Sequence, residues 1–194
     1  MSTIDTDALD RADMGRLRAG EAAALNDLME RHATGVFHFL FRMLGNEDDA
    51  EDLAQETFTR VYRYNGSFVP GARFSTWLYT IAGNLARNHH RWRARHPNLS
   101  LEAPAGASEQ TVAETLPAPE ALPSETAIAS ERAFAIRTAV ARLPDDLREA
   151  LILCEWEELP VAEAAVVLNS TAKAVESRLY RARQLLRRQL ASWL

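Results

Sequence analysis

The chain has 194 residues, of which 47% are hydrophobic, and its net charge is −5 at neutral pH. This length allows one domain of ordinary size or two small ones, with enough apolar residues to build cores. Cys154 is the single cysteine, so no internal disulfide can form, as is typical of a reducing cytosol. The acidic, polar N-terminus lacks a signal-peptide pattern and no apolar run is long enough to span a membrane. We therefore expect a cytoplasmic protein without direct membrane insertion.

Charge is strongly segregated along the chain. Residues 1–56 hold 13 acids against 5 cations, whereas residues 57–96 hold 7 arginines and no acid. Residues 97–131 hold 6 glutamates and no cation, residues 132–170 hold 7 acids and 4 cations, and residues 171–194 hold 6 cations and one acid. Two basic segments separated by acidic ones indicate two surfaces that face a polyanion. Solvated helix faces are the alternative explanation.

The first part of the chain has the apolar period of helices. Between residues 14 and 44, apolar side chains recur close to the helical period, at Leu25, Leu28, Met29, Val36, Phe37, Leu40, Phe41 and Leu44. Asn46 is a suitable N-cap for the next helix, because acids follow it in what would be the first turn.

Residues 48–64, DDAEDLAQETFTRVYRY, change from acids to arginines and aromatics within one predicted helix. Its apolar side is expected to carry Leu53, Phe58, Val61 and Tyr62. On the opposite side, Asp49, Asp52, Gln55 and Glu56 recur at steps of three and four and so share one exposed stripe. Such a stripe suits a basic partner protein better than DNA. A solvated acidic face is the alternative, and spacing by itself favours it.

Helix breakers and then a basic helix follow. Gly66, Pro70 and Gly71 predict a loop with Phe68, Arg73 and Phe74 near its ends. Ser75 or Thr76 is expected to cap a helix whose apolar side carries Trp77, Leu78, Ile81 and Leu85. The far end of this helix gathers Asn84, Arg87, Asn88, His89, His90, Arg91, Trp92, Arg93 and Arg95.

This mixture of cations, rings and amides is typical of a nucleic-acid surface. Arginine neutralises phosphates, rings stack on unpaired bases and amides read base edges. The adjacent His89 and His90 would point in different directions on a helix, and no cysteine or acid is close to them in the sequence. We therefore expect no metal site.

Residues 97–129 contain five of the eight prolines and no aromatic residue. With no helical or strand period, they predict a flexible, extended, acidic linker. The sequence thus predicts an all-α protein with two small helical domains, residues 1–96 and 130–194, joined by that linker.

The second domain carries a helix-turn-helix pattern. Helices are expected to start near Pro144 and Pro160, and Asn169 suits the left-handed turn after the second of them. The last helix would bury Val175, Leu179, Ala182 and Leu186 and expose Lys173, Ser177, Arg178, Tyr180, Arg181, Arg183, Arg187 and Arg188. A short helix, a tight turn and a cation-rich helix predict a helix-turn-helix, the arrangement that lays its last helix in the major groove of DNA. An ordinary helical bundle is the alternative.

The chain resembles a bacterial RNA polymerase sigma factor of the small, two-domain extracytoplasmic-function group. The resemblance rests on DAEDLAQETFTRVY, FSTWLYTIAGNLARN and LPDDLREALILCEWEELPVAEAAVVLNSTAKAVESRLYRARQLL. These segments lie in the family's order and spacing and cover about 150 residues in both domains. A helix-turn-helix alone is weak support, whereas DLxQExF followed by STWLYxIAxNxARN is highly specific.

The resemblance implies a function for each domain. Asp49, Asp52, Leu53, Gln55 and Glu56 would dock on the clamp coiled coil of the polymerase largest subunit, and the flap would be a further polymerase contact. In the first domain, the loop from Phe68 through Arg73 to Phe74 would capture a base flipped from the minus-ten element. The adjoining strands would be contacted by a set of residues on the following helix, Asn84, Arg87, Asn88 and Arg91.

In the second domain, the resemblance places Glu176, Ser177, Tyr180 and Arg181 toward the minus-thirty-five element, with Lys173 and Arg178 beside them. One departure concerns the start of this helix, where the family often has a glycine-threonine pair and a basic residue before the serine. Here those places hold Lys173, Ala174 and Glu176. A glutamate repels phosphates but accepts a hydrogen bond from cytosine N4, so the identity of the element is open.

The resemblance also implies that the linker threads toward the active-site cleft of the polymerase. Its glutamates make it a candidate mimic of nucleic acid, although any acidic, proline-containing tether stays extended. An anti-sigma factor is an expected further partner.

Two other classes of function fit the sequence less well. A stand-alone helix-turn-helix regulator would leave the DLxQE stripe and the aromatic loop without a role. An enzyme acting on nucleic acid is not expected, because the sequence shows no nucleophile-base arrangement, metal-ligand cluster or phosphate-binding glycine loop. We predict no catalytic residue and no cofactor.

Overall fold

The computed structural model describes residues 5–96 and 123–193, and within these ranges every regular element is a helix. The all-α prediction is therefore confirmed. None of the helices in the described part of the chain is both long and apolar enough to cross a membrane.

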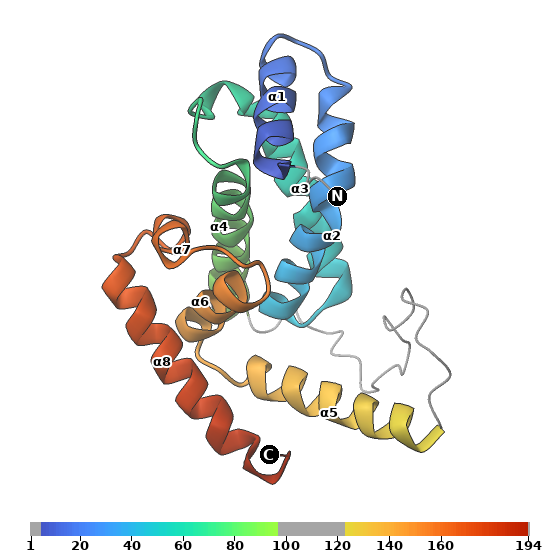
Figure 1. Cartoon of the computed structure of the whole chain (residues 1–194), viewed down its shortest axis with the longest axis vertical. Coiled ribbons are helices and arrows are strands. Elements are labelled where there is room, and N and C mark those ends of the chain that lie inside the picture. Colours follow the sequence, from blue (N-terminus) through green and yellow to red (C-terminus); the bar gives the residue numbers. More distant parts are fainter. Residues whose placement is uncertain (1–4, 97–122, 194) are drawn as a thin grey trace.

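The first half of the chain forms a bundle of four helices (Figure 1). They are α1 (Thr6–Arg18), α2 (Ala24–Leu44), α3 (Glu47–Arg63) and α4 (Phe74–Arg95), with a short 3-10 helix, η1 (Asn65–Ser67), between the last two. The predicted apolar faces pack inside the bundle, where Leu28, Val36, Leu40, Phe58 and Leu78 are buried. Tyr62 is a correction, because its side chain is 51% exposed rather than packed.

Two helix starts test the capping predictions. Asn46 caps α3 as predicted, since its side-chain oxygen accepts a hydrogen bond from the Asp49 amide at 2.8 Å. The start of α4 is two to three residues earlier than predicted. Arg73 is its N-cap residue, without a side-chain cap, and Ser75 and Thr76 lie inside the helix. Thr76 instead donates to Glu163, which is far away in the sequence.

The second half contains α5 (Pro123–Ala141), α6 (Asp145–Glu155), α7 (Val161–Val167), α8 (Ala172–Gln189) and the 3-10 helix η3 (Ala191–Trp193). Pro144 and Pro160 precede α6 and α7 as predicted, and Asn169 adopts a left-handed φ of 46° in the turn before α8. This geometry confirms the helix-turn-helix.

The end of the predicted linker needs correction. Helix α5 begins at Pro123, so residues 123–129 are helical rather than extended. Proline is favoured in the first turn of a helix because its φ is already suitable and its missing N–H has no helical partner. The preceding segment, residues 97–122, lies outside the described residues.

The two halves pack against one another. Helix α7 lies beside α4 (Figure 1), and α6 contacts α2. One continuous apolar cluster contains buried residues from both halves, including Phe39 and Leu78 from the first and Leu151, Ile152 and Ala164 from the second. The free chain thus has a closed arrangement that the sequence alone did not predict.

Candidate nucleic-acid interface

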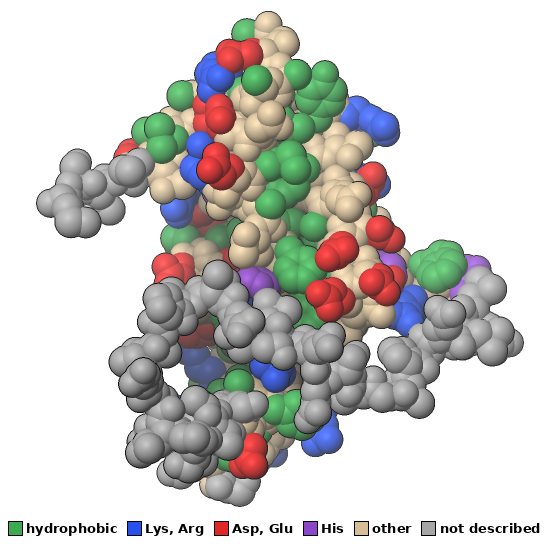
Figure 2. All heavy atoms as spheres, turned by 90° about the vertical axis from the view of Figure 1, so that its right-hand side faces the viewer, with side chains coloured by type: hydrophobic (Ala, Val, Ile, Leu, Met, Phe, Trp, Pro, Cys, Tyr) green, Lys and Arg blue, Asp and Glu red, His purple; other side chains and the backbone are tan. Residues whose placement is uncertain are grey.

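The predicted docking stripe lies on the outer side of α3. Its residues differ in exposure and in whether their side chains already have partners within the chain. Asp52 and Gln55 are exposed, and their side chains make no hydrogen bond or ion pair within the described residues. Glu56 pairs with Arg60 at 2.7 Å on the same helix. Leu53 is half-buried against the core. Figure 2 shows acidic side chains gathered on the face of the molecule that α2 and α3 form.

Asp49 differs from Asp52 and Gln55 because its carboxylate is paired with side chains of α4. Its carboxylate lies 3.4 Å from His89 Nε2 and 3.1 Å from Arg93 Nη1, both on α4. The proximity of Asp49 to His89 was missed because the two residues are 40 positions apart in the sequence. This contact ties the start of α3 to the end of α4 and leaves Asp52 and Gln55 as the accessible part of the stripe.

The aromatic residues of the loop are buried. Phe68 and Phe74 are 4% and 1% exposed, and both pack against Trp77, with ring centroids 5.4 Å and 6.2 Å from it. Phe74 therefore has no free face on which a base could stack. Phe68 is also one of the residues that line a neighbouring cavity.

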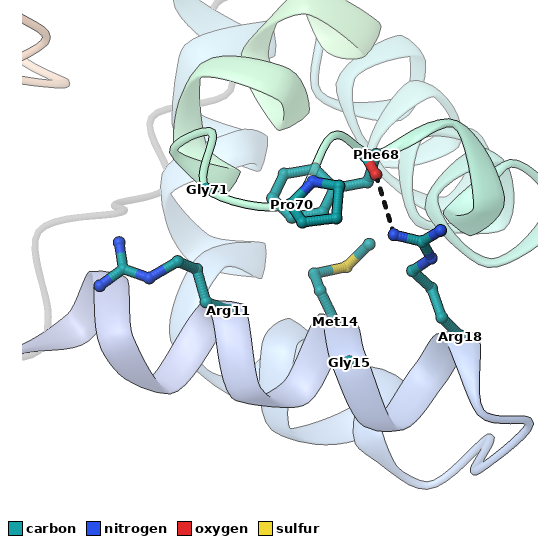
Figure 3. A pocket seen from close by; sticks show the side chains of 7 residues that line it. All are labelled: Arg11, Met14, Gly15, Arg18, Phe68, Pro70 and Gly71. Atoms are coloured by element: carbon teal, nitrogen blue, oxygen red, sulfur yellow. Dashed lines mark hydrogen bonds between the residues drawn. The ribbon is translucent and has the colours of Figure 1, made fainter.

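This cavity lies between α1 and the loop and has a volume of about 220 Å³. Its walls are formed by residues of α1 and of the loop, namely Arg11, Met14, Gly15, Arg18, Phe68, Pro70 and Gly71 (Figure 3). Arg18 Nη1 donates to the carbonyl oxygen of Phe68 at 3.3 Å, whereas Arg11 has no hydrogen bond or ion pair within the described residues. The two arginines lie on either side of Met14.

Sequence reasoning missed Arg11 and Arg18. They are seven positions apart, so they share one face of α1 with Met14 between them. That spacing was a usable signal. However, only the fold shows that the loop, about 50 residues later in the chain, lies opposite this face.

The cations of α4 are partly engaged within the chain. Arg87 pairs with the buried carboxylate of Glu149 and donates to Asn84 Oδ1 at 2.7 Å, and Arg91 donates to Asn88 Oδ1 at 2.6 Å. Asn84, Asn88 and Arg91 are exposed. Three of the four predicted minus-ten residues of α4 thus stay accessible, whereas Arg87 is half-buried against Glu149 of α6.

Arg73, at the start of α4, also forms ion pairs within the chain. Its guanidinium lies 2.8 Å from Asp7 and 3.0 Å from Glu163. The first partner comes from α1 and the second from α7, so Arg73 joins three parts of the chain.

Helix α8 presents an open face. Lys173, Glu176, Ser177, Tyr180 and Arg181 are all exposed, and Thr171 caps the helix by accepting from the Ala174 amide at 3.2 Å. Arg178 differs from its predicted neighbours, because it is half-buried and lies 3.6 Å from Asp146 of α6. The structure thus brings together five of the six residues predicted for this surface.

Comparison with known families identifies the two halves. The model described as "Sigma-70 region 2" matches residues 28–96, and "Sigma-70, region 4" matches residues 133–186. The chain is 34% identical over 176 residues to the ECF RNA polymerase sigma factor SigW of Bacillus subtilis, covering 90% of this chain and 93% of that protein. It belongs to the ECF sigma factors. The chain is also 36% identical over 177 residues to the RNA polymerase sigma factor CarQ of Myxococcus xanthus, covering 91% and 95% of the two proteins.

Solved structures share the fold of this sigma factor. The structure of CnrH in complex with the cytosolic domain of CnrY has a TM-score of 0.70 at 23% identity and covers 95% of this chain and 98% of its own. The sigma factor RpoE of Bartonella quintana, in complex with the anti-sigma factor NepR, has a TM-score of 0.65 at 25% identity, covering 86% and 96%. As a sigma factor, the chain recognises promoters and directs transcription initiation by RNA polymerase.

The contact between the two halves of this sigma factor alters three pKa values. Burial raises the pKa of Glu149, and the charge and hydrogen bond of Arg87 only partly oppose it. Burial also raises the pKa of Glu157, against the hydrogen bond from Tyr79 and the charge of Arg42. The pKa of Tyr79 is raised by burial and by Glu157. Tyr79 thus stays a neutral donor to Glu157.

The described residues were also compared with the ligand sets that metal ions need, with His89 and His90 of α4 as the histidine pair. Within residues 5–96 and 123–193, no group of three or more His, Cys, Asp or Glu side chains is placed to hold an ion. His89 faces Asp49, whereas His90 Nε2 lies 3.2 Å from the Met43 carbonyl oxygen. The two rings therefore have different partners, as expected for adjacent positions on a helix.

Proposed function

We propose that this sigma factor uses three separate surfaces during initiation. Residues 1–96 would dock on core RNA polymerase and open the minus-ten element, residues 130–194 would bind the minus-thirty-five element, and residues 97–129 would connect them. Support comes from the matches of region 2 and region 4 to the two halves of one chain.

The first surface is the stripe on α3. Asp52 and Gln55 would contact the clamp coiled coil of the polymerase largest subunit, with Leu53 and Glu56 beside them and Asp49 joining once His89 and Arg93 release it. Asp52 is exposed and has no ion pair within the described residues, so it can attract a basic surface without first breaking a bond in the chain. The flap of the polymerase is the proposed contact of the second half.

The second surface combines the cavity of Figure 3 with α4. A base flipped from the minus-ten element would enter between α1 and the loop, against Phe68 and Pro70. Arg11 and Arg18 would neutralise the flanking phosphates. Extruding a base costs a few kcal/mol, which stacking and phosphate contacts offset. Asn84, Arg87, Asn88 and Arg91 would contact the adjoining strand, with Arg73 and Phe74 supporting the loop.

The third surface is the open face of α8. Glu176, Ser177, Tyr180 and Arg181 would face base edges in the major groove, and Lys173 would contact phosphate. Arg178, held by Asp146, would orient α8 on α6 rather than read a base. Glu176 suits a cytosine, whose N4 donates to a carboxylate.

The remaining partners follow from the family. RpoE of Bartonella quintana is bound by the anti-sigma factor NepR, and we propose that an anti-sigma factor also regulates this chain. We further propose that it acts in the cytoplasm, where the polymerase is, and that it is not an enzyme and needs no cofactor.

Run-off transcription with purified core RNA polymerase and a library of promoter fragments tests this function. We expect transcripts from a subset of fragments only when the chain is added. A stand-alone regulator would bind fragments without giving transcripts and would not displace the housekeeping sigma factor from the core enzyme.

A further inference from the structure

Helix α1 precedes the segment that the region 2 model matches, yet one of its faces lies against the proposed minus-ten loop (Figure 3). Four residues recur along α1 at steps of four, three and four and so share that face, namely Asp7, Arg11, Met14 and Arg18. At the start of the loop, Arg18 Nη1 donates to the carbonyl oxygen of Phe68 at 3.3 Å. At its end, Arg73 Nε lies 2.8 Å from Asp7 Oδ2. One helix thus contacts both ends of the loop.

A neighbouring side of α1 carries a buried carboxylate. Asp10 is only 1% exposed, and each of its oxygens has a partner on α2. Oδ1 accepts from Arg31 Nε at 2.9 Å, and Oδ2 lies 2.8 Å from His32 Nε2. A buried carboxylate is costly unless both of its oxygens are paired. Asp10 therefore holds the His32 side chain in one orientation.

The His32 ring connects this buried carboxylate to the loop. Its centroid lies 5.1 Å from that of Phe74, the first residue of α4. The Phe74 ring in turn lies 6.3 Å from the Phe68 ring, in an edge-to-face arrangement. Phe74 is close-packed, so its ring cannot shift without moving its neighbours. Contacts therefore run without a gap from Asp10, through His32 and Phe74, to a residue that lines the cavity.

Asp13 offers a comparison within the same helix. It is also buried, and its carboxylate accepts from Arg31 Nη2 at 2.5 Å and from Arg16 Nη1 at 2.8 Å. Among the described residues, however, Asp13 makes no hydrogen bond or ion pair with His32 or with the loop. Both carboxylates thus join α1 to α2 through Arg31, and only Asp10 is also connected to the loop.

We propose that Asp10 and His32 are positioning residues for base capture. Asp10 holds the His32 ring against Phe74, and Phe74 keeps Phe68 at the distance from α1 that lets a flipped base enter the cavity. Asp10 is buried and acts on the base only through these contacts. A site for a single base needs such support, because its walls have to be held within about 0.5 Å of the productive geometry. This inference rests on the proposed function of the cavity.

The test uses two substitutions and one matched control. Asp10→Asn keeps the shape of the side chain but removes the charge and one of the two acceptor oxygens. His32→Gln keeps a donor for Asp10 but removes the ring that contacts Phe74. Asp13→Asn is the control, because it weakens the same contact between α1 and α2 without altering the partner of His32.

Run-off transcription with core polymerase is measured on two templates, a duplex promoter and the same promoter with an unpaired minus-ten region. Urea unfolding of each full-length variant measures its stability. If Asp10→Asn does not fold, His32→Gln carries the same test, since it leaves Asp10 paired.

We expect Asp10→Asn and His32→Gln to reduce transcription from the duplex template by about five-fold or more, as for residues that act on a site through a chain of contacts. On the unpaired template both should transcribe like wild-type chain, because the cost of extruding the base is already removed. Asp13→Asn should lose as much stability as Asp10→Asn and yet transcribe both templates like wild-type chain.

Equal losses on the two templates would overturn the proposal, because a merely structural role reduces transcription from both. So would a loss with Asp13→Asn as large as that with Asp10→Asn, or normal transcription from the duplex by His32→Gln. Wild-type chain that transcribes neither template would show instead that the proposed function itself has failed.

Discussion

Gly83 of α4 and Glu149 of α6 are in such close contact that a β-carbon on Gly83 would lie 2.7 Å from the Glu149 carboxylate. Two helices from different halves of the chain meet here without space for a methyl group. The displaced atoms would be the ends of two side chains, since Arg87 Nη1 is also only 3.2 Å away. However, Glu149 is buried and has little room to move.

Gly83→Ala should therefore weaken the closed arrangement. We expect overpacking to cost about 1–3 kcal/mol at the contact, although alanine favours the helix itself by about 1 kcal/mol. Gly15→Ala in α1 is the matched control, because a β-carbon there meets nothing within 4 Å. This variant should therefore show only the stabilisation that alanine gives to a helix. Urea unfolding measures both variants. Equal stabilisation by the two substitutions would mean that there is no tight steric contact between Glu149 and α4.

The docking stripe gives a second prediction. Asp52→Arg combined with Gln55→Ala should abolish binding to core polymerase while leaving helicity unchanged, because the change reverses charge on an exposed face. Glu30→Arg adds the same charge on α2, at an exposed position without an ion pair within the described residues, and should bind normally. Competition with the housekeeping sigma factor is the measurement. Normal affinity of the double variant would contradict the docking assignment.

Two substitutions in α8 should distinguish residues that contact bases from residues that contact phosphates. Arg181→Ala should cost about 1–3 kcal/mol on the cognate duplex and relax the preference at one position. Arg188→Ala should weaken binding to all DNA sequences alike. It should also reduce the slope of log affinity against log salt concentration by about one. Titrations of cognate and scrambled duplexes at several salt concentrations distinguish the two effects. Glu176→Lys should raise non-specific affinity and alter one base preference, and no change in either would place Glu176 outside the groove.

The closed arrangement should depend on pH. Burial raises the pKa of Glu149 and of Glu157 above the ordinary value for glutamate. Because the closed chain holds these protons more tightly than an open chain, it is favoured at pH values below the raised pKa and loses that preference as the pH rises through it. The groups facing the two carboxylates are Arg87, Arg178, Asp145, Tyr79 and Arg42.

Scattering at about pH 5 and about pH 8 measures this effect, with a more extended chain expected at the higher value. The variant Glu149→Gln with Glu157→Gln is the control, since it should show no such difference. A wild-type chain that extends on acidification would reverse the sign and contradict the prediction.

The sequence predicts features that depend on a few neighbouring residues. Asn46 as a cap, Pro144 and Pro160 before their helices and Asn169 in the left-handed turn are all confirmed, because capping and turn geometry are local. The helical period also predicted the buried side of α8, where Val175, Leu179 and Ala182 are buried, although Leu186, the fourth residue predicted there, is only half-buried.

Contacts between distant segments were not predictable in the same way. Glu149, Glu157 and Glu163 share no helical spacing, and their partners on α4 lie 62, 78 and 87 residues away. Burial of Phe68 was missed for a related reason. A lone aromatic residue between loop residues suggests exposure, and only the fold shows Trp77 packed against it.

This burial alters how the minus-ten surface is best tested. Removing a buried phenylalanine costs about 3–5 kcal/mol of stability, so Phe68→Ala would confound folding with DNA binding. Arg11 is exposed and unpaired within the described residues, which makes it the cleaner position for substitution.

Permanganate oxidation of unpaired thymines on a promoter tests most directly whether this chain opens DNA as a sigma factor. With core polymerase and wild-type chain, we expect reactive thymines confined to the minus-ten region, and none when either protein is omitted. Arg11→Ala should reduce their reactivity at unchanged binding to core polymerase. Promoters that are transcribed with the chain present but show no unpaired thymines, or reactivity with core polymerase alone, would contradict a role of this chain in opening the minus-ten region.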